Sequence, residues 1–395
     1  MNSTYRYFDY NATTPVAADV LAEMYPFFNE HFANPSSVHQ LSRIPSKALR
    51  KARREVAALL GVLDENEIIF TSGGTESNNT AIRAALAITG KKEIVTSAVE
   101  HSSVLKLCRQ LENEGYQVHT IPVNGSGVLD LEKLKNCLSD RTAVVSIMHA
   151  NNETGVIFTI EEIARLVKER VILFHVDAVQ TVGKLSLHLE KSGIDFLSLS
   201  AHKFYGPKGA GALYAKKSAG YQPMVFGGSQ ERGRRSGTEN VPGIVGLGSA
   251  AHLVGSDLAS EGSRIKALRD DFEWQVCREI QGTEINGGSV SRISNTSNIS
   301  FEGISGESLL MALDQKNICV STGSACMSGA SEPSHVLKAM GLSDEKAKSA
   351  IRFSFGRLTK KEDVRDLIQA LKESINQILA AKPEVKSQRE CLVKG

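Results

Sequence analysis

The sequence lacks most of the features that would assign it quickly to a class of protein. Its 395 residues contain 46 Lys and Arg against 44 Asp and Glu, so no surplus of positive charge is present to attract nucleic acid. No apolar run approaches the length of a membrane span, and the stretch MNSTYRYFDYNATTP lacks the charged-then-apolar layout of a signal peptide. These absences predict a cytoplasmic protein that binds neither nucleic acid nor membrane.

Cysteine is scarce and scattered, and two common nucleotide motifs are missing. The six cysteines form no C-x-x-C pair, which in a reducing compartment argues against a disulfide framework and against a closed zinc site. No metal site is therefore predicted. No G-x-G-x-x-G opens a helix and no G-x-x-x-x-G-K-[ST] occurs, so dinucleotide and P-loop sites are not expected either.

Short apolar runs alternate with helix-length segments over the first half of the chain. Continuously apolar strands separated by helices indicate βαβ units and a mostly parallel sheet covered on both faces. We expect helices at 76–88, 103–115 and 159–170. The expected strands lie at 67–72, 92–98, 142–150, 171–178 and 195–201.

The pattern changes after about residue 260. A long helix is expected at 263–280, a strand at 296–303 and an amphipathic helix at 360–381, which together indicate a smaller α+β domain. The length also suggests two domains, because one core rarely serves so long a chain. We predict a large domain at 16–260, a small domain built from 1–15 and 261–382, and a flexible tail at 383–395.

Polar or glycine-rich residues follow each of the five predicted strands. Ligands of open parallel sheets bind at the carboxyl ends of the strands, so these residues are expected to converge. Taken singly, each has a structural explanation as a turn or a helix cap. Five such ends in succession favour a common binding crevice instead. They are SGGTES (72–77), Glu100–His101, Asn151–Asn152, Asp177 with Gln180, and His202–Lys203.

The residue types at these ends suit one kind of ligand. In the segment 72–75, backbone N–H groups and a hydroxyl at the N-terminus of a helix suit a phosphate-binding site. The Asp177 carboxylate suits a protonated ring nitrogen, and the flat ring of His101 suits stacking. Lys203 suits a Schiff base, if burial or a neighbouring cation lowers its pKa. Phosphate, pyridinium and Schiff base together describe pyridoxal 5'-phosphate.

The segment SLSAHKFYGPKGAGALY resembles the lysine segment of fold-type I pyridoxal-phosphate enzymes, and more narrowly of the cysteine desulfurases of the NifS and IscS type. The resemblance implies an α/β fold whose large cofactor-binding domain holds a mostly parallel, seven-stranded sheet, beside a smaller α+β domain. It covers nearly the whole chain, through DYNATTP (9–15), NPSSVH (34–39), TSGGTESNN (71–79), EHSSVL (100–105), HANNETG (149–155), HVDAVQTVG (175–183), GGSQERGRRSGTEN (227–240), STGSACMSG (321–329), EPSHVLKAMG (332–341) and IRFSFGR (351–357).

The resemblance also implies roles for single residues. Lys203 forms the Schiff base, and His101 stacks on the ring and assists proton transfer. Arg352 takes the substrate carboxylate, a task that suits the guanidinium fork. The other expected contacts are Asp177 with the ring nitrogen, Gln180 with the phenolic oxygen, Gly74, Thr75, Ser200 and His202 with the phosphate, Asn152 with cofactor and substrate, and Thr238 with the phosphate of a second subunit.

Cys326 distinguishes this group from its relatives. It lies among small residues that do not pack a core, in a setting that suits a reactive thiolate. The resemblance makes it the nucleophile that accepts sulfur from L-cysteine as a persulfide and releases L-alanine, on a mobile loop at about 321–335. The implied protein is a homodimer with shared active sites. It passes sulfur to an acceptor, such as a scaffold for iron–sulfur cluster assembly or for another sulfur-containing cofactor.

Two alternatives remain at this point. A selenocysteine lyase or another pyridoxal-phosphate lyase or aminotransferase of this fold shares most of the motifs, although an aminotransferase has no need of Cys326. A non-catalytic sulfur carrier on the same scaffold has no need of Lys203 or Asp177, and both are present. The sequence does not indicate which acceptor receives the sulfur.

Overall fold

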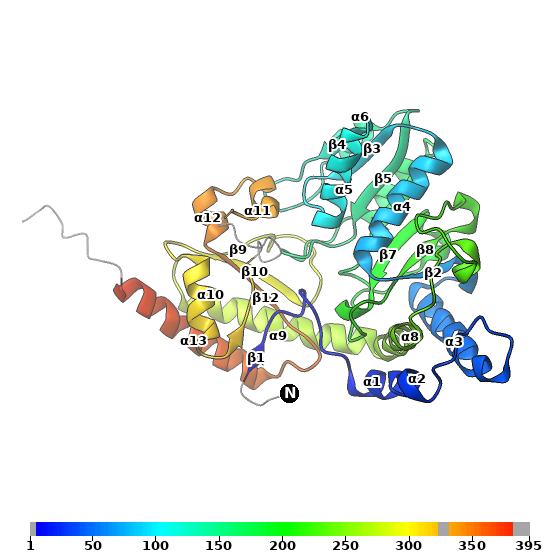
Figure 1. Cartoon of the computed structure of the whole chain (residues 1–395). Helices are drawn as coiled ribbons and strands as arrows, with labels where there is room; N and C mark the ends of the chain where they lie inside the picture. The colour runs from blue at the N-terminus through cyan, green and yellow to red at the C-terminus, as the bar shows by residue number, and fades with distance from the viewer. Residues whose placement is uncertain (1–4, 323–331, 382–395) are drawn as a thin grey trace, which may run out of the picture.

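The computed structural model of the chain describes residues 5–322 and 332–381. Its largest sheet has seven strands, which Figure 1 shows in cyan and green. The five strands from β7 to β4 run parallel, and β8 pairs antiparallel with both of its neighbours. The order across the sheet is β2 (Ile68–Thr71), β8 (Gly211–Ala215), β7 (Phe196–Ser200), β6 (Leu173–Asp177), β5 (Thr142–Met148), β3 (Glu93–Ser97) and β4 (Gln117–Ile121).

Helices cover both faces of this sheet. α4 (Gly74–Thr89) and α5 (Ser102–Asn113) bury residues such as Ile82 and Leu107 against one face. α3 (Arg43–Leu60), α7 (Ile160–Lys168) and α8 (Val241–Gly255) bury theirs in the core on the other face. Because both faces of the sheet are covered, six of its strands are buried almost throughout, whereas the edge strand β4 is mostly exposed or half-buried. The predicted α/β fold with a mostly parallel seven-stranded sheet is confirmed.

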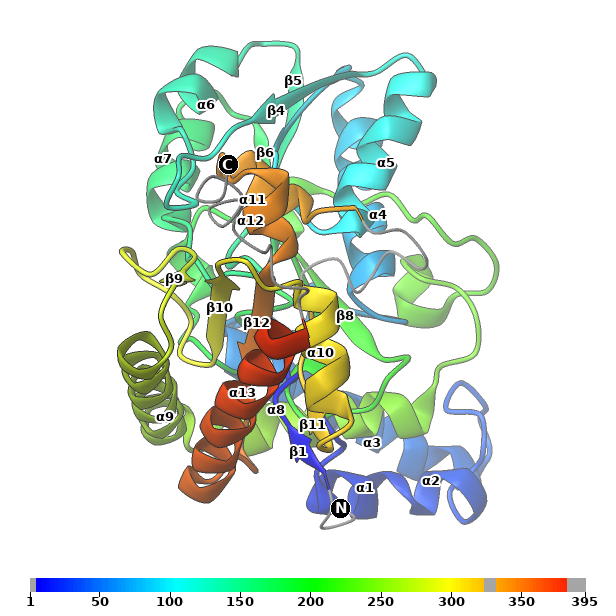
Figure 2. The ribbon, with the colours of Figure 1, turned by 90° about the vertical axis from the view of Figure 1, so that its left-hand side faces the viewer.

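A second group of elements lies beside the sheet and shares its own core of apolar residues, among them Phe272 and Phe353. Figure 2 shows α9 and α13 alongside β10 and β12. The N-terminal strand joins this group, since β1 pairs in parallel with β11. The members are β1 (Arg6–Tyr7), α9 (Leu258–Glu279), β9 (Thr283–Ile285), β10 (Thr296–Phe301), α10 (Gly306–Asp314), β11 (Ile318–Cys319), β12 (Ala350–Ser354) and α13 (Lys361–Ala381).

Five shorter helices complete the described chain. They are α1 (Ala18–Met24), α2 (Pro26–Asn29), α6 (Leu131–Cys137), α11 (His335–Ala339) and α12 (Asp344–Lys348). In the ranges 5–322 and 332–381 no helix is both long enough and apolar enough to span a membrane. The predicted boundary between the domains, at residues 260 and 261, falls inside α9, and the division into two domains stays a prediction.

Tight backbone contacts fix the start of α4 at the edge where the site is expected. Gly73 precedes the helix with φ of 150°, a conformation that a residue with a Cβ rarely adopts. A Cβ on Gly211 of β8 would lie 2.5 Å from the Gly73 Cα, so both positions need glycine for this close approach. The first turn of α4 is thereby held against the carboxyl end of β7.

Candidate active site

Lys203 stands immediately beyond β7, in a 3-10 turn over Ala201–Lys203. Its Nζ donates to the carbonyl oxygen of Asn11 at 2.5 Å and to that of Ala12 at 2.8 Å. The Thr14 N–H in turn donates to the His202 carbonyl at 2.8 Å. The DYNATTP segment therefore lines the lysine, although the two are separated by about 190 positions in the sequence.

Asp177 ends the neighbouring strand β6 and is buried. Its Oδ1 accepts from the Val179 N–H at 3.0 Å, and its Oδ2 accepts from Asn78 Nδ2 at 2.7 Å. Asp177 is thus held as an acceptor at the edge of the sheet that also carries Lys203.

His101 caps the N-terminus of α5, and its contacts determine which ring nitrogen carries the proton. The Ser103 N–H donates to Nδ1 at 3.1 Å, so in the neutral ring the proton lies on Nε2. Burial lowers the pKa of His101, the charges of Lys203 and His335 act in the same direction, and Asp177 opposes them. The ring is therefore neutral at pH 7 and able to accept a proton.

Three of the predicted phosphate residues, Gly74, Thr75 and Ser200, lie at the start of α4. Ser200 is buried at the end of β7, and a Cβ on Gly73 would lie 3.6 Å from its Oγ. Thr75 is exposed in the first turn of the helix. Burial, with Lys203 and Lys208, lowers the pKa of His202 to about 4, so this ring is neutral as well. Helix N–H groups at such a start suit a phosphate.

Arg352 and Asn152, the two predicted substrate residues, are in contact. Arg352 lies on β12 and is buried. Its Nη1 donates to the Asn152 carbonyl at 3.1 Å, and its Nη2 lies 2.7 Å from Asp9 Oδ1. Its Nε is buried and has no hydrogen-bond partner among the described residues. An unpartnered guanidinium N–H of this kind is costly unless a ligand accepts from it.

The donor set fits pyridoxal phosphate. A carboxylate, a lysine and a helix start with exposed backbone lie at neighbouring strand ends, where the cofactor's ring nitrogen, aldehyde and phosphate require them. The described ranges contain no cluster of three or more His, Cys, Asp or Glu side chains arranged to hold a metal ion.

Comparison with known proteins agrees with the assignment of a pyridoxal-phosphate site. Residues 6–367 match the family model of the class-V aminotransferases. A cysteine desulfurase of Trichormus azollae is 49% identical over 378 residues, which cover 95% of this chain and 94% of that protein. The cysteine desulfurase IscS of Dictyoglomus turgidum is 46% identical over 379 residues, 95% of this chain and 96% of its own.

A solved structure of a NifS-like protein superposes with a TM-score of 0.89 at 38% identity, covering 94% of this chain and 100% of that one. The chain belongs to the cysteine desulfurases, within the class-V aminotransferase family. The predicted family and fold type are confirmed. The predicted dependence of this desulfurase on pyridoxal phosphate is confirmed as well, because the family binds that cofactor as a Schiff base with a lysine.

Asn78 is a residue of the desulfurase site that was not predicted. Asn78 Nδ2 donates both to Asp177 Oδ2 and, at 2.9 Å, to Ser103 Oγ, which itself lies 2.8 Å from His101 Nδ1. Asn78 therefore connects the carboxylate to the histidine. The motif TSGGTESNN contains it, but only the packing of α4 against α5 and β6 reveals the contact.

Thr238 and Cys326 are not brought to Lys203 by any described contact. Thr238 is exposed, and its segment is held to the phosphate end of α4 by Arg235, whose Nε lies 2.8 Å from Glu76 Oε1. Cys326 and most of the predicted loop at 321–335, like the predicted tail at 383–395, lie outside the described residues.

The described residues on either side of Cys326 both border the site of this desulfurase. Before it, Ser321 exchanges backbone hydrogen bonds with Arg352 at 2.7 and 3.2 Å. After it, His335 Nε2 lies 3.0 Å from the Glu100 carbonyl oxygen, next to His101. Ser334 Oγ donates to the buried Glu153 at 2.5 Å. The chain that carries Cys326 thus leaves and rejoins the described structure beside predicted substrate and cofactor residues.

Proposed function

We propose that this chain removes sulfur from L-cysteine, releases L-alanine and carries the sulfur as a persulfide on Cys326. The arrangement of Lys203, Asp177 and Arg352 supports this proposal most directly. The Schiff-base lysine and a buried carboxylate lie at neighbouring strand ends of the large sheet. The buried guanidinium of Arg352, on β12, has no hydrogen-bond partner at Nε among the described residues. Such a site suits an amino acid substrate, because the guanidinium can bind its carboxylate while the cofactor activates its α-carbon.

Seven residues bind and orient the cofactor in this proposal, three at its ring and four at its phosphate. Lys203 holds it as a Schiff base, Asp177 keeps the ring nitrogen protonated, and Gln180 donates to the phenolic oxygen. The phosphate rests on Gly74, Thr75, Ser200 and His202. Once bound, pyridoxal phosphate supplies an electron sink for the α-carbon of the substrate.

His101 and Arg352 act on the substrate. Arg352 binds its carboxylate through the guanidinium, and Asn152 borders the same place. His101 is neutral with its proton on Nε2, so it stacks without adding charge beside the cofactor and accepts or returns protons during the reaction.

Cys326 takes the sulfur. Its thiolate attacks the sulfur of bound cysteine, the new S–S bond forms as the substrate Cβ–S bond breaks, and the electron pair of that bond stays with carbon. Proton uptake at that carbon gives L-alanine. The thiolate is the attacking species because the thiol is a weak nucleophile. A sulfur acceptor, such as an iron–sulfur scaffold protein, then receives the outer sulfur from Cys326.

A homodimer in the cytoplasm is the expected working form, with Thr238 of each subunit reaching the phosphate of the other. Large apolar side chains are exposed near the N-terminus, where Tyr25, Phe28 and Phe32 are 62%, 61% and 71% exposed. Apolar side chains exposed together favour contact with a partner. Thr238 is exposed as well, which suits a contact across subunits.

The experiment uses purified holoenzyme, L-cysteine and no reductant. Alanine should appear, and the peptide that contains Cys326 should gain the mass of about one sulfur atom. Borohydride reduction should attach the cofactor to Lys203, with the exposed Lys208 as the internal control. A label on Lys208, or alanine release at the wild-type rate by Cys326→Ser, contradicts the proposal. Turnover of selenocysteine alone would favour a selenocysteine lyase.

A further inference from the structure

Lys184 is a second lysine beside the Schiff-base lysine, and the roles above leave it without a task. It follows Gln180 by four positions in the turn after β6, so both side chains lie on one side of that turn. Lys184 Nζ donates to Gln180 Oε1 at 2.9 Å and lies 3.5 Å from Asn11 Oδ1. Both partners are acceptors, so the nitrogen is the donor in each contact.

The opposite end of the Gln180 amide is held just as firmly. Gln180 Nε2 donates to the Asn11 carbonyl oxygen at 3.1 Å. The same carbonyl accepts from Lys203 Nζ at 2.5 Å. A backbone carbonyl only accepts, so the Gln180 nitrogen must lie on this side, next to the Lys203 ammonium. Rotation of the amide by 180° would set its oxygen against the carbonyl and its nitrogen against Lys184.

Asn11 itself has a fixed orientation. Its Nδ2 donates to the Asn152 carbonyl at 3.1 Å and to Thr296 Oγ1 at 2.8 Å, while its Oδ1 accepts from Asn295 Nδ2 at 2.9 Å. The Asn152 carbonyl again only accepts. Asn11 is buried, so its Oδ1 remains turned toward Lys184. Lys184 and Asn11 together enclose the Gln180 amide from both ends.

We propose that Lys184 is a positioning residue of the active site, which fixes the Gln180 amide so that the remaining N–H of Nε2 points to the phenolic oxygen of pyridoxal phosphate. One N–H of that nitrogen is taken by the Asn11 carbonyl, and the second is the donor that remains on the Gln180 side chain. The inference rests on the proposed function, because it gives Gln180 its cofactor contact. Burial and the cations Lys203 and Arg352 lower the pKa of Lys184 to about 7, which agrees with its place beside the Schiff-base lysine.

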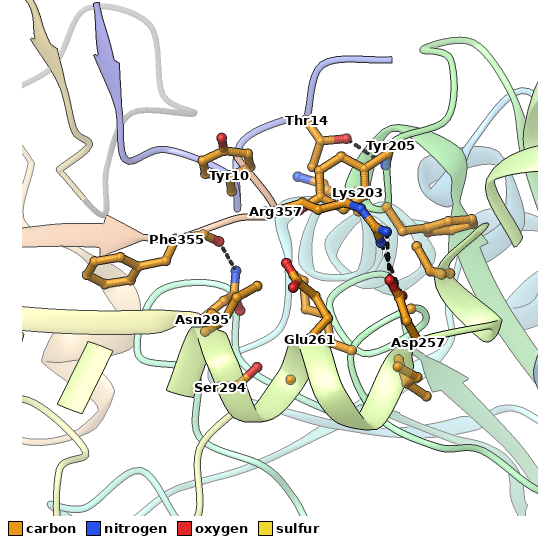
Figure 3. A pocket seen from close by; sticks show the side chains of 17 residues that line it. Tyr10, Thr14, Lys203, Tyr205, Asp257, Glu261, Ser294, Asn295, Phe355 and Arg357 are labelled. Carbon is orange, nitrogen blue, oxygen red and sulfur yellow. Dashed lines mark hydrogen bonds and ion pairs between the residues drawn. The ribbon is translucent and has the colours of Figure 1, made fainter. Parts of the chain in front are cut away.

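A small cavity adjoins both lysines. It has a volume of about 40 Å³ and is lined by Lys184 and Lys203 together with residues of the N-terminal segment, α9 and the end of β12. Figure 3 shows Lys203 with Tyr10, Asn295 and the ion pair of Arg357 with Asp257 around it. The cavity has room for about one water molecule, so it does not hold the cofactor.

The test follows the pH midpoint at which the cofactor Schiff base of the holoenzyme loses its proton, read from its absorbance. A donor to the phenolic oxygen stabilises the phenolate and lowers this midpoint. Lys184→Met keeps an unbranched side chain as far as the Cε position but removes the terminal donor, so the amide is released and the midpoint should rise by about one pH unit, a tenfold change in the proton equilibrium. Lys191→Met, at an exposed lysine on the same segment, should leave the midpoint unchanged.

The dependence on Gln180 distinguishes positioning from simple loss of charge. Gln180→Leu should raise the midpoint by a similar amount, and the double variant with Lys184→Met should show no further rise. Additive shifts, or a Lys184→Met midpoint equal to that of Lys191→Met, would overturn the inference. If Lys184→Met does not fold, Lys184→Arg still decides the question, because its N–H groups restore the donor. A midpoint in Lys184→Arg as high as in Gln180→Leu also overturns it.

Failure of the proposed function has a different signature. Wild-type protein that shows no Schiff-base absorbance, or no alanine from cysteine, would contradict the proposed function before any variant is compared. Normal wild-type absorbance and turnover with an unchanged midpoint in Lys184→Met would remove only the role of Lys184.

Discussion

Arg352 Nη2 lies 2.7 Å from Asp9 Oδ1, so the guanidinium proposed to bind the substrate already has a carboxylate partner. Asp9 belongs to the DYNATTP segment and Arg352 to β12, and 343 positions separate them in the sequence. The ion pair and the Asn152 carbonyl each take one end of the guanidinium, which leaves its Nε for a ligand. Asp9 thus sets the direction from which a carboxylate approaches.

Loss of Asp9 should therefore weaken substrate binding more than it slows chemistry. In Asp9→Ala the guanidinium gains freedom that cysteine must remove on binding, and KM for cysteine should rise about tenfold while kcat changes little. Asp366→Ala removes one of the two carboxylates that pair with Arg6, at 2.8 Å and near the surface, and serves as the control. An unchanged or lower KM in Asp9→Ala would mean that Asp9 competes with the substrate and does not orient Arg352.

Subunit mixing tests the proposed position of Thr238. A Lys203→Ala subunit and a Thr238→Ala subunit are each expected to be nearly inactive as homodimers. If Thr238 acts across the interface, their heterodimer contains one site with both lesions and one with neither, so about half of the dimer's activity should return. Absence of recovery, with subunit exchange confirmed by mass, would place Thr238 in its own subunit's site.

The segment that carries Thr238 is fixed by a buried ion pair. Arg53 Nη2 lies 2.6 Å from Glu231 Oε1, Arg53 Nη1 donates to Glu231 Oε2 at 2.8 Å, and the guanidinium lies 4.4 Å from the centre of the Phe70 ring. The Phe70 N–H also donates to Glu231 at 3.0 Å. These contacts join α3, β2 and the GGSQERGRRSGTEN segment. Glu231 adopts φ of 48°, which its buried contacts maintain.

Breaking this pair should cost far more stability than breaking its exposed neighbour. Arg53→Met leaves the Glu231 carboxylate buried without its cation, and the free energy of unfolding should fall by about 3–5 kcal/mol. Arg54→Met is the matched control, because Arg54 pairs with Glu65 at 2.7 Å but its side chain is 68% exposed. That change should cost less than about 1 kcal/mol. Equal losses, measured by urea unfolding, would contradict the structural role of Glu231.

The sequence predicted most of the sheet because its strands are continuously apolar. The runs at 67–72, 92–98 and 142–150 correspond to β2, β3 and β5, each of which is two residues shorter than expected. β4 was missed because it is an edge strand with mostly exposed or half-buried residues. β8 was missed because GALYA directly follows a glycine-rich segment, and the whole stretch was interpreted as a turn.

The site was predictable only where the chemistry lies at the strand ends themselves. Asp177 is the last residue of β6 and Lys203 lies in the turn after β7, so the topology of a parallel sheet brings them together. Asn78, Asp9 and Lys184 were not predicted because each acts through a partner from another part of the fold. A polar residue on a helix or in a turn has no distinctive pattern until its partner is placed.

Two buried carboxyl groups near the site should each contribute a term that lowers the free energy of unfolding as pH rises. Burial raises the pKa of Glu100 to about 8 and that of Glu153 to about 7. Between pH 5 and pH 7 both are mainly protonated in the folded protein and ionised in the unfolded chain, where carboxyl pKa values are about 4.3. At these two groups the unfolded state then binds fewer protons, so their contribution to the free energy of unfolding falls as pH increases, while the histidines whose pKa is lowered by burial, such as His202, contribute in the opposite direction.

Glu153→Gln should reduce this fall. The amide keeps the shape of the protonated carboxyl group, and its oxygen still accepts from Ser334. Each buried carboxyl group contributes up to about 1.4 kcal/mol per pH unit to the slope, so the variant should lose stability more slowly than wild type between pH 5 and pH 7. Glu132→Gln, at an exposed position on α6, should follow the wild-type slope. Urea unfolding of the three holoenzymes at pH 5, 6 and 7 provides the measurement. Parallel slopes for Glu153→Gln and wild type would mean that Glu153 is ionised in the folded protein and that its charge is compensated, with Arg352 the nearest candidate.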